Sequence, residues 1–241
     1  ILRCLWSTST SLRPRNSHVT HVIFDMDGLL LNTEDLYTEA FQNICSEYGK
    51  EYTWSIKMHC MGQKPDASAK YTIDQLNLPL TTEQWKEKLG KQLNVVFSRS
   101  KLLPGAKKLV SHLKSKGIPI AICSGSSKAA FVAKTSHHSE FFSQFDPIVL
   151  CGDDPEVKHG KPHPDAYNVT NSRFAFPPNP KTVLVFEDAP NGVIAGVEAG
   201  MQVVMVPDHR VPNTLTEKAT VALKSLEDFK PEDFGLPAYD E

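Results

Sequence analysis

The chain has 241 residues and a formal net charge of -2 at pH 7; 40% of its residues are hydrophobic and 22% are charged. A chain of this length can bury a sizeable core, as one large domain or as two small ones. The nearly balanced charge, without a block of one sign, argues against a nucleic-acid polymer or an anionic membrane as a partner. No apolar run approaches the roughly 20 residues that a membrane-spanning helix needs.

The cysteines and the N-terminal residues bear on the cellular compartment. Five cysteines show neither a CxxC pair nor a zinc-like spacing, which predicts free thiols in a reducing compartment such as the cytoplasm. They are Cys4, Cys45, Cys60, Cys123 and Cys151. Residues 1–17 are rich in Ser and Thr and contain arginines but no acidic residue. That composition is typical of a disordered tail and also of a mitochondrial transit segment, and both interpretations stay open.

The first predicted strand, His21–Phe24, is followed by a long segment without a strand pattern. Helical patterns in that segment cover about Glu34–Tyr48, Lys64–Leu76 and Thr82–Ser98. The last of them begins with a capping pattern. We therefore predict a small all-helical domain over residues 33–103, inserted after the first strand of a core made of residues 18–32 and 104–241. We expect the aromatic residues of the insert to pack inside it, namely Trp54, Tyr71 and Trp85.

The rest of the chain alternates between short apolar runs and helical patterns. The runs are apolar on both faces, as in parallel strands covered by helices, and lie at Ile118–Cys123, Pro147–Leu150, Val183–Phe186 and Val203–Val206. The helical patterns lie at about Gly105–Lys116, Ser126–Lys134, Pro164–Ser172 and Asn191–Ala199. This alternation predicts an α/β fold with a doubly wound parallel sheet.

Carboxylates follow two of the predicted strands. Asp25 and Asp27 come directly after the first strand, and residues two apart on a strand point the same way. Glu187 and Asp188 follow the strand Val183–Phe186. Ligand sites of open α/β sheets lie beyond the carboxyl ends of the strands, so we expect these four side chains to meet there. They would repel one another without a cation, and hard oxygen ligands select Mg²⁺ or Ca²⁺, of which Mg²⁺ with a phosphate is the simpler explanation.

Two further segments offer contacts for an anion at the same edge. Ser124 supplies a hydroxyl after the strand Ile118–Cys123, and Gly125 lets the backbone approach an anion closely before a helix begins. Lys161 precedes a proline, which favours an extended backbone there. Each feature alone is common in ordinary turns and helix caps. Their joint position at successive strand ends predicts a phosphate site.

The same features, read in order, resemble a known family. "DMDG", a strand that ends in Ser124, "GKP" and "VFEDAPNG" are similar to the four motifs of the haloacid dehalogenase-like superfamily. Longer runs such as "FDMDGLLLNTE", "GDDPEVKHGKP" and "AGMQVVMVPD" look like its pseudouridine-5'-phosphatase subgroup. The resemblance covers about residues 21–239. It implies a Rossmann-like core, a helical cap over the site, and a Mg²⁺-dependent phosphatase or phosphomutase.

The resemblance also implies a role for each acidic residue. Asp25 would attack phosphorus and form an aspartyl-phosphate, and Asp27 would protonate the leaving oxygen and then activate water. Mg²⁺ would be bound by the side chain of Asp25, the backbone carbonyl of Asp27 and the side chain of Asp188. Glu187 would contribute to the metal site through water. The aspartate two residues after the nucleophile points to phosphoryl chemistry rather than dehalogenation.

Other residues would bind the substrate by the same resemblance. Ser124, the Gly125 amide and Lys161 would hold the phosphoryl oxygens, so that Ser124 and Lys161 also count as catalytic. The turn "CMGQKPD" in the helical insert would place Gly62 and Lys64 near the leaving group, although a plain surface loop is an equal alternative.

Several alternatives remain open at this stage. The expected reaction is hydrolysis of pseudouridine 5'-phosphate to pseudouridine and phosphate. A phosphatase of sugar or glycerol phosphates, a sugar phosphomutase and a catalytically silent binding module are the competitors, and we expect a monomer or weak dimer. Two residues depart from the family pattern: Asn32 replaces an aspartate but can still cap a helix, and His163 replaces the aspartate of the common KPDP form. His163 changes the charge close to Lys161 and is expected to add pH sensitivity.

Overall fold

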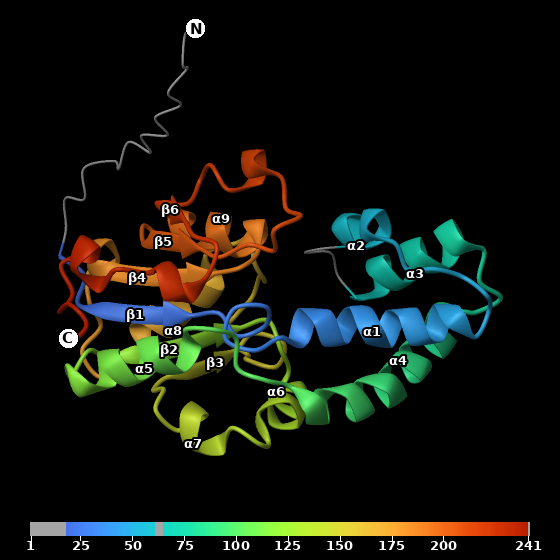
Figure 1. The fold of residues 1–241 in the computed structure, drawn as a ribbon, viewed down its shortest axis with the longest axis horizontal. Helices are drawn as coiled ribbons and strands as arrows, with labels where there is room; N and C mark the ends of the chain where they lie inside the picture. Colours follow the sequence, from blue (N-terminus) through green and yellow to red (C-terminus); the bar gives the residue numbers. More distant parts are fainter. Residues whose placement is uncertain (1–17, 61–64, 241) are drawn as a thin grey trace, which may run out of the picture.

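The larger lobe of the molecule is built on one parallel sheet. The structure is a computed structural model that describes residues 18–60 and 65–240, so residues 1–17, Gly62 and Lys64 lie outside the described part. The six strands have the order β3-β2-β1-β4-β5-β6 (Figure 1). Their bounds are β1 His21–Phe24, β2 Ile120–Ser124, β3 Ile148–Leu150, β4 Val183–Glu187, β5 Gln202–Met205 and β6 Val221–Ala222. This is the strand order of a doubly wound sheet, so the predicted fold class is confirmed.

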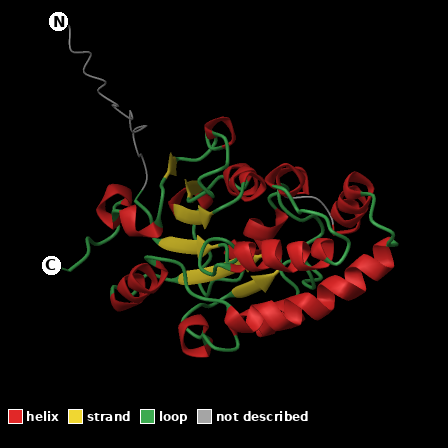
Figure 2. Ribbon diagram, turned by 45° about the vertical axis from the view of Figure 1, so that its right-hand side comes forward, coloured by secondary structure: helices red, strands yellow, loops and turns green. Residues whose placement is uncertain are grey.

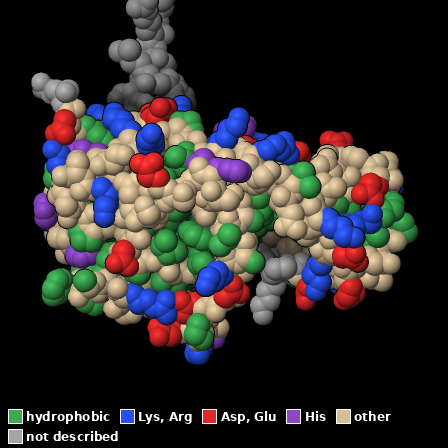
Figure 3. Space-filling model, turned by 90° about the horizontal axis from the view of Figure 1, so that it is seen from below, with side chains coloured by type: hydrophobic (Ala, Val, Ile, Leu, Met, Phe, Trp, Pro, Cys, Tyr) green, Lys and Arg blue, Asp and Glu red, His purple; other side chains and the backbone are tan. Residues whose placement is uncertain are grey.

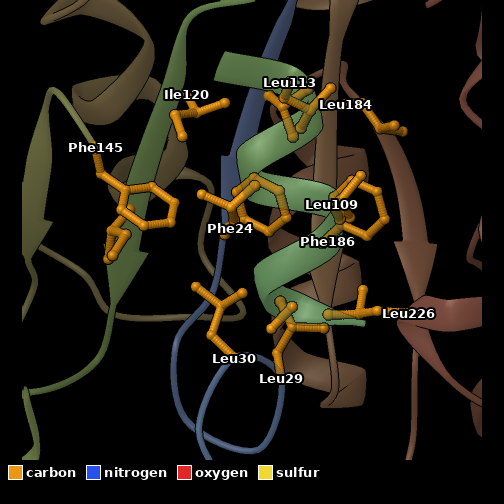
Figure 4. Packing of buried hydrophobic residues seen from close by; sticks show 14 of the residues in the cluster. Phe24, Leu29, Leu30, Leu109, Leu113, Ile120, Phe145, Leu184, Phe186 and Leu226 are labelled. Carbon is orange, nitrogen blue, oxygen red and sulfur yellow. The ribbon is translucent and has the colours of Figure 1, made fainter. Parts of the chain in front are cut away.

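Helices cover both faces of the sheet and bury its apolar strands. The bounds of the helices are α5 Ala106–Ser115, α6 Lys128–Thr135, α7 Ser139–Phe142, α8 Asp165–Ser172 and α9 Pro190–Glu198. On the face covered by α5, the rings of Phe24 and Phe186 stack 4.9 Å apart next to Leu109 (Figure 4). On the other face, α8 and α9 pack against Ile23 and Val185. Because both faces are buried, the strands lack an alternating polar pattern.

The sequence patterns did not indicate three of the regular elements. These are β6, α7 and α2, the last of which spans Trp54–Cys60. β6 has two residues that only extend the pairing of β5, and α7 has four residues, which is too short for a helical period to show. Five 3₁₀ turns complete the described part, at Phe97–Arg99, Pro180–Thr182, Asn213–Leu215, Leu226–Asp228 and Pro231–Phe234.

A helical insert follows β1 and forms the smaller lobe (Figure 1). It contains α1 Thr33–Ser46, α2, α3 Pro65–Leu76 and α4 Thr82–Val96. Among the described residues, Figure 2 shows strands in the larger lobe and none in the smaller one. The insert has its own apolar cluster, and α4 begins with the expected capping box between Thr81 and Gln84. Burial is confirmed for Trp85, which is 2% exposed, and Tyr71 packs against the same cluster. The expectation that Trp54 packs inside the insert is wrong: its ring centroid lies 4.0 Å from the guanidinium carbon of Arg210, which belongs to the larger lobe.

Asn32 joins the two chain segments that connect the lobes. Its side-chain oxygen accepts a hydrogen bond of 2.7 Å from the backbone N–H of Lys101, and its own N–H donates to the carbonyl of Lys101 at 3.0 Å. Asn32 makes no side-chain hydrogen bond to the start of α1. The expectation that it caps this helix is therefore wrong, because the amide oxygen is used across the connection instead.

The distribution of charged side chains on the surface and the state of the cysteines match the expectations from the composition. Figure 3 shows acidic and basic side chains interspersed on one face, without a large field of either sign. Within residues 18–60 and 65–240, no helix combines the length and the apolar character needed to cross a bilayer. The described cysteines are free, as expected, and their reducing compartment stays a prediction: Cys45, Cys60, Cys123 and Cys151.

Candidate active site

The predicted core residues meet at one edge of the sheet, beside the helical insert. Asp25 follows β1, Ser124 ends β2, Glu187 ends β4, and Lys161 lies in the loop that leads to α8. A cavity of about 390 Å³ lies between the two lobes. Its core side is lined by Asp25, Asp27, Gly125, Lys161, Glu187 and Asp188, and its insert side by Tyr37, Phe41, Tyr52, Lys57, Cys60 and Ser68. Parallel strands present their carboxyl ends together, which explains this convergence.

Lys161 is bound to both of the neighbouring strand ends. Its Nζ donates to Asp25 Oδ1 at 2.7 Å, to Glu187 Oε1 at 2.7 Å and to the Cys123 carbonyl at 2.9 Å. All three of its N–H donors are therefore used. Burial alone would lower the pKa of Lys161, but Asp25 and Glu187 outweigh it and hold that pKa well above its ordinary value. Lys161 is thus a fixed positive charge and not a solvated surface lysine.

Glu187 holds Lys161 in place through a fully satisfied carboxylate. Besides the contact with Lys161, its Oε1 accepts a hydrogen bond of 2.6 Å from the hydroxyl of Tyr167. Its Oε2 accepts from the backbone N–H groups of Asp188 and Ala189 at 3.1 and 3.2 Å. With these four donors Glu187 is only 1% exposed. Its oxygens are less available to a metal than those of Asp25 and Asp188, which suits the predicted role through water.

Asp25, Glu187 and Asp188 form a cluster that fits a hard divalent cation. One carboxylate oxygen from each lies within 4.8 Å of the others. Burial raises the pKa of Asp25 to about 8, although Lys161 opposes the shift. Burial and the charges of Glu187 and Asp25 also raise the pKa of Asp188 well above its ordinary value. The raised pKa values indicate that this cluster carries more negative charge than Lys161 alone balances. The all-oxygen donor set matches the chemistry of Mg²⁺.

Gly28 leaves the space that Asp188 occupies. Its φ of 78° lies in the left-handed region, and a Cβ at this position would overlap Asp188 Oδ2. A glycine is therefore needed both for the backbone turn and for the approach of the carboxylate.

Asp27 is bound separately from Asp25, by a cation and hydroxyl groups. Lys134 Nζ lies 2.6 Å from its Oδ1, and Thr33 Oγ1 donates to the same oxygen at 2.6 Å. Ser126 and Ser124 donate to Oδ2 at 2.8 and 3.3 Å. Burial would raise the pKa of Asp27, but Lys134 and the hydroxyls of Thr33 and Ser126 outweigh it and lower that pKa. Asp27 is consequently ionised in this arrangement, ready to accept a proton, and it can serve as an acid only after gaining one.

The comparisons with known proteins place this site in a family. A family model described as haloacid dehalogenase-like hydrolase matches residues 22–206, which include every described residue of the site. This chain is a haloacid dehalogenase-like hydrolase. The family resemblance expected from the four sequence motifs is therefore confirmed.

Two curated relatives and one solved structure show the range of this hydrolase's neighbours. A Drosophila melanogaster protein named "Probable pseudouridine-5'-phosphatase" is 44% identical, over 92% of this chain and 96% of its own. An Arabidopsis thaliana protein named "(DL)-glycerol-3-phosphatase 1, mitochondrial" is 46% identical, over 92% of this chain and 76% of its own. A haloacid dehalogenase-family hydrolase of Deinococcus radiodurans, solved with phosphate and sodium, superposes with a TM-score of 0.77. It covers 93% of this chain and 100% of its own at 23% identity, which shows a shared fold.

Lys134 is the principal site residue of this hydrolase that sequence reasoning missed. It projects from α6, its side chain is 1% exposed, and its Nζ donates to Ser126 Oγ at 2.8 Å. The ring centroids of Tyr37 and Phe97, both in the insert, lie 4.9 Å from the same nitrogen. Lys134 thus links the core, the insert and Asp27. The available signal was the spacing of Lys134 from an apolar residue. Phe131 packs against the core cluster, and Lys134, three residues later, lies on the same side of α6.

Gly192 gives a test of the Glu187 and Lys161 contacts. A Cβ at Gly192 would overlap the Glu187 carboxylate. We expect Gly192→Ala to displace that carboxylate and, with it, Lys161. It should lower kcat/KM for a phosphate ester at least about tenfold, since a displaced Lys161 no longer lies where it can contact the phosphate.

Gly90 in α4 is the matched control, because a Cβ there meets no atom within 4 Å. Gly90→Ala should keep full activity and gain about 0.5–1 kcal/mol of stability in urea unfolding. Equal activity of the two variants would contradict the assignment.

Proposed function

We propose that this hydrolase is a Mg²⁺-dependent phosphatase that releases phosphate from a small phosphate monoester. The observation that carries the proposal is the paired arrangement of Asp25, bound to Lys161, and Asp27, bound to Lys134, at one cavity. One carboxylate faces a cation that can also hold a phosphate, and the other lies at the same cavity with a lysine of its own, where it can exchange a proton with the substrate. Relatives named as phosphatases support the same reaction class.

The proposed reaction has two steps with balanced bonds and protons. Before the first step, Asp27 takes up a proton from solvent. An oxygen of Asp25 then forms a bond to phosphorus while the bond between phosphorus and the ester oxygen breaks, and the leaving oxygen takes that proton from Asp27. In the second, water attacks the aspartyl-phosphate, Asp27 takes the proton of that water, and Asp25 is released with inorganic phosphate. Lys161, the hydroxyl of Ser124 and the Gly125 amide hold the phosphoryl oxygens. For this, Ser124 must turn from Asp27, and Lys161 must exchange its contact with Asp25 for one with the phosphate.

The Mg²⁺ that we propose would be held by Asp25, Asp188 and the backbone carbonyl of Asp27, with Glu187 acting through water. When bound, it supplies positive charge between the phosphate and the Asp25 carboxylate. We expect removal of divalent cations by a chelator to lower phosphate release at least about 100-fold, and added Mg²⁺ to restore it. Calorimetry should also show a higher unfolding temperature with Mg²⁺. Full activity after exhaustive chelation would contradict the metal assignment.

We propose pseudouridine 5'-phosphate as the substrate and the helical insert as the cap that selects it. The insert side of the cavity carries the rings of Tyr37, Phe41 and Tyr52, which suit a flat base, and the buried amine of Lys57. Its volume of about 390 Å³ is adequate for a small nucleotide. The resemblance to the Drosophila protein supports the same choice. Glycerol 3-phosphate is the second candidate, because the Arabidopsis relative is as similar.

A phosphate-release screen with Mg²⁺ tests the substrate. It compares pseudouridine 5'-phosphate, uridine 5'-phosphate, glycerol 3-phosphate and glucose 1-phosphate at equal concentrations. We expect the highest kcat/KM for pseudouridine 5'-phosphate. A preference for glycerol 3-phosphate would replace the substrate and keep the reaction class, whereas conversion of glucose 1-phosphate to glucose 6-phosphate without phosphate release would identify a mutase. No turnover of any phosphate ester would contradict the proposal.

A further inference from the structure

The loop that carries Lys161 places a second group of metal-binding side chains on the outside of the molecule. His159 Nδ1 lies 3.0 Å from Asp165 Oδ2, and His163 Nδ1 lies 2.9 Å from Asp165 Oδ1. The two imidazole rings are 4.6 Å apart. One ligand atom from each of the three residues lies within 4.8 Å of the others. This cluster is separate from Asp25, Glu187 and Asp188, and the proposed reaction does not use it.

Backbone contacts hold the three side chains together without a metal. The N–H of His159 donates to Asp165 Oδ2 at 3.0 Å, and the N–H of His163 donates to the Gly160 carbonyl at 3.0 Å. Asp165 is the first residue of α8. The loop is therefore closed on itself, and its ligand atoms converge before any ion is bound.

The donor set differs in chemistry from the oxygen cluster in the cavity. Two imidazole nitrogens and one carboxylate oxygen form a borderline set that prefers Zn²⁺, Co²⁺ or Ni²⁺ to Mg²⁺. Zinc bonds of about 2.0–2.1 Å in tetrahedral geometry place neighbouring ligand atoms about 3.3 Å apart. The observed separations of 2.9 and 3.0 Å are close to this value, but they join the two histidines to different oxygens of Asp165. An ion there would contact both carboxylate oxygens or require one imidazole to turn toward the other oxygen. The side chains of His159 and His163 are 66% and 50% exposed, so water can complete the coordination.

We propose that His159, His163 and Asp165 form a binding site for Zn²⁺ or a similar divalent transition metal. The site encloses Lys161 in sequence, since its ligands lie two residues before and two and four residues after that lysine. A bound ion ties both ends of this segment and restricts the backbone that positions the Lys161 ammonium. The inference concerns metal binding and does not depend on the proposed phosphatase activity.

Metal binding to the full chain tests the proposal. Equilibrium dialysis with Zn²⁺ is carried out in saturating Mg²⁺, and Co²⁺ serves as a spectroscopic probe of the ligands. We expect the wild type to bind one more Zn²⁺ than His159→Asn or His163→Asn, or to bind it more than about tenfold more tightly. The variant Asp188→Asn should keep this binding, because it changes only the oxygen cluster. His209→Asn is the matched control, as His209 is exposed beside a carboxylate but outside the site.

Three results would overturn the proposal. The first is Zn²⁺ binding that is equal in the wild type and the two histidine variants. The second is binding that is lost in Asp188→Asn, which would place the ion in the cavity. The third is a thiolate charge-transfer band with Co²⁺, which would assign the ion to cysteines. Because dialysis and Co²⁺ absorption need no substrate, a failure of the phosphatase proposal leaves this test intact.

Discussion

Asp25→Asn is expected to abolish phosphate release, with a fall in kcat on the order of 10⁴-fold or more, because the amide cannot form the acyl phosphate. Lys161 would still have Glu187 and the Cys123 carbonyl as partners, so the site should keep its shape. Steady-state kinetics with the best substrate measure the loss. Rapid acid quench with ³²P-labelled substrate should trap a phosphorylated chain in the wild type and none in the variant.

Asp74→Asn is the matched control for Asp25→Asn. Asp74 pairs with Lys70 at 2.8 Å on the exposed side of α3, where such a pair contributes at most about 1 kcal/mol. The control should retain wild-type kcat and the labelled intermediate. Turnover by Asp25→Asn near the wild-type rate would mean that another group attacks phosphorus.

The same substitution has an expected effect on stability that depends on pH. Burial raises the pKa of Asp25 from 3.8 to about 8, so between these pH values the folded chain holds a proton that the unfolded chain has lost. Stability therefore falls as the pH rises through this range. Without metal, the wild type should lose thermal stability relative to Asp25→Asn between about pH 4 and pH 8. Melting curves in chelator measure the difference, and a constant difference across the range would contradict the assigned burial effect.

Lys134→Met is expected to lower the free energy of unfolding by about 3 kcal/mol, because it leaves the Asp27 carboxylate without its cation. Lys134 is almost fully buried and Asp27 is 18% exposed, so solvent compensates little for the lost partner. Asp27→Asn should also destabilise the fold, because it leaves the buried ammonium without a counter-charge between two aromatic rings. The double variant should lose less than the sum of the two single losses, since it leaves neither charge alone. Urea unfolding of the four proteins measures this coupling.

Lys91→Met is the matched control for Lys134→Met. Lys91 pairs with Glu87 at 2.7 Å, and both side chains are largely exposed, so its removal should cost at most about 1 kcal/mol. A similarly small cost for Lys134→Met, or strictly additive losses in the double variant, would show that the pair with Asp27 contributes little to stability.

The fold class could be predicted because buried parallel strands are apolar on both faces. β1 and its neighbours showed this pattern directly, and turn residues bounded each of them. Strand ends shifted by one or two residues, as for β2, which begins at Ile120 where the pattern begins at Ile118. The short elements β6 and α7 have too few residues for a period to be visible. Their formation depends on the neighbouring β5 and on the apolar cluster that contains Phe141 and Phe142.

The sequence by itself determined which core residues meet, because parallel strands end at one edge and the backbone carries Asp25, Ser124 and Glu187 there. Only the tertiary structure decided their partners. Asp25 binds Lys161 and Asp27 binds Lys134, although the two carboxylates are only two residues apart. The choice depends on two contacts between elements. The loop before α8 brings Lys161 to Asp25, and α6, which packs against the 3₁₀ turn Phe97–Arg99 of the insert, brings Lys134 to Asp27. A charge is costly to bury unless a counter-charge from another element reaches it. The residue pattern within a single helix or strand does not indicate which residue from a distant part of the chain will pair with Asp25 or Asp27.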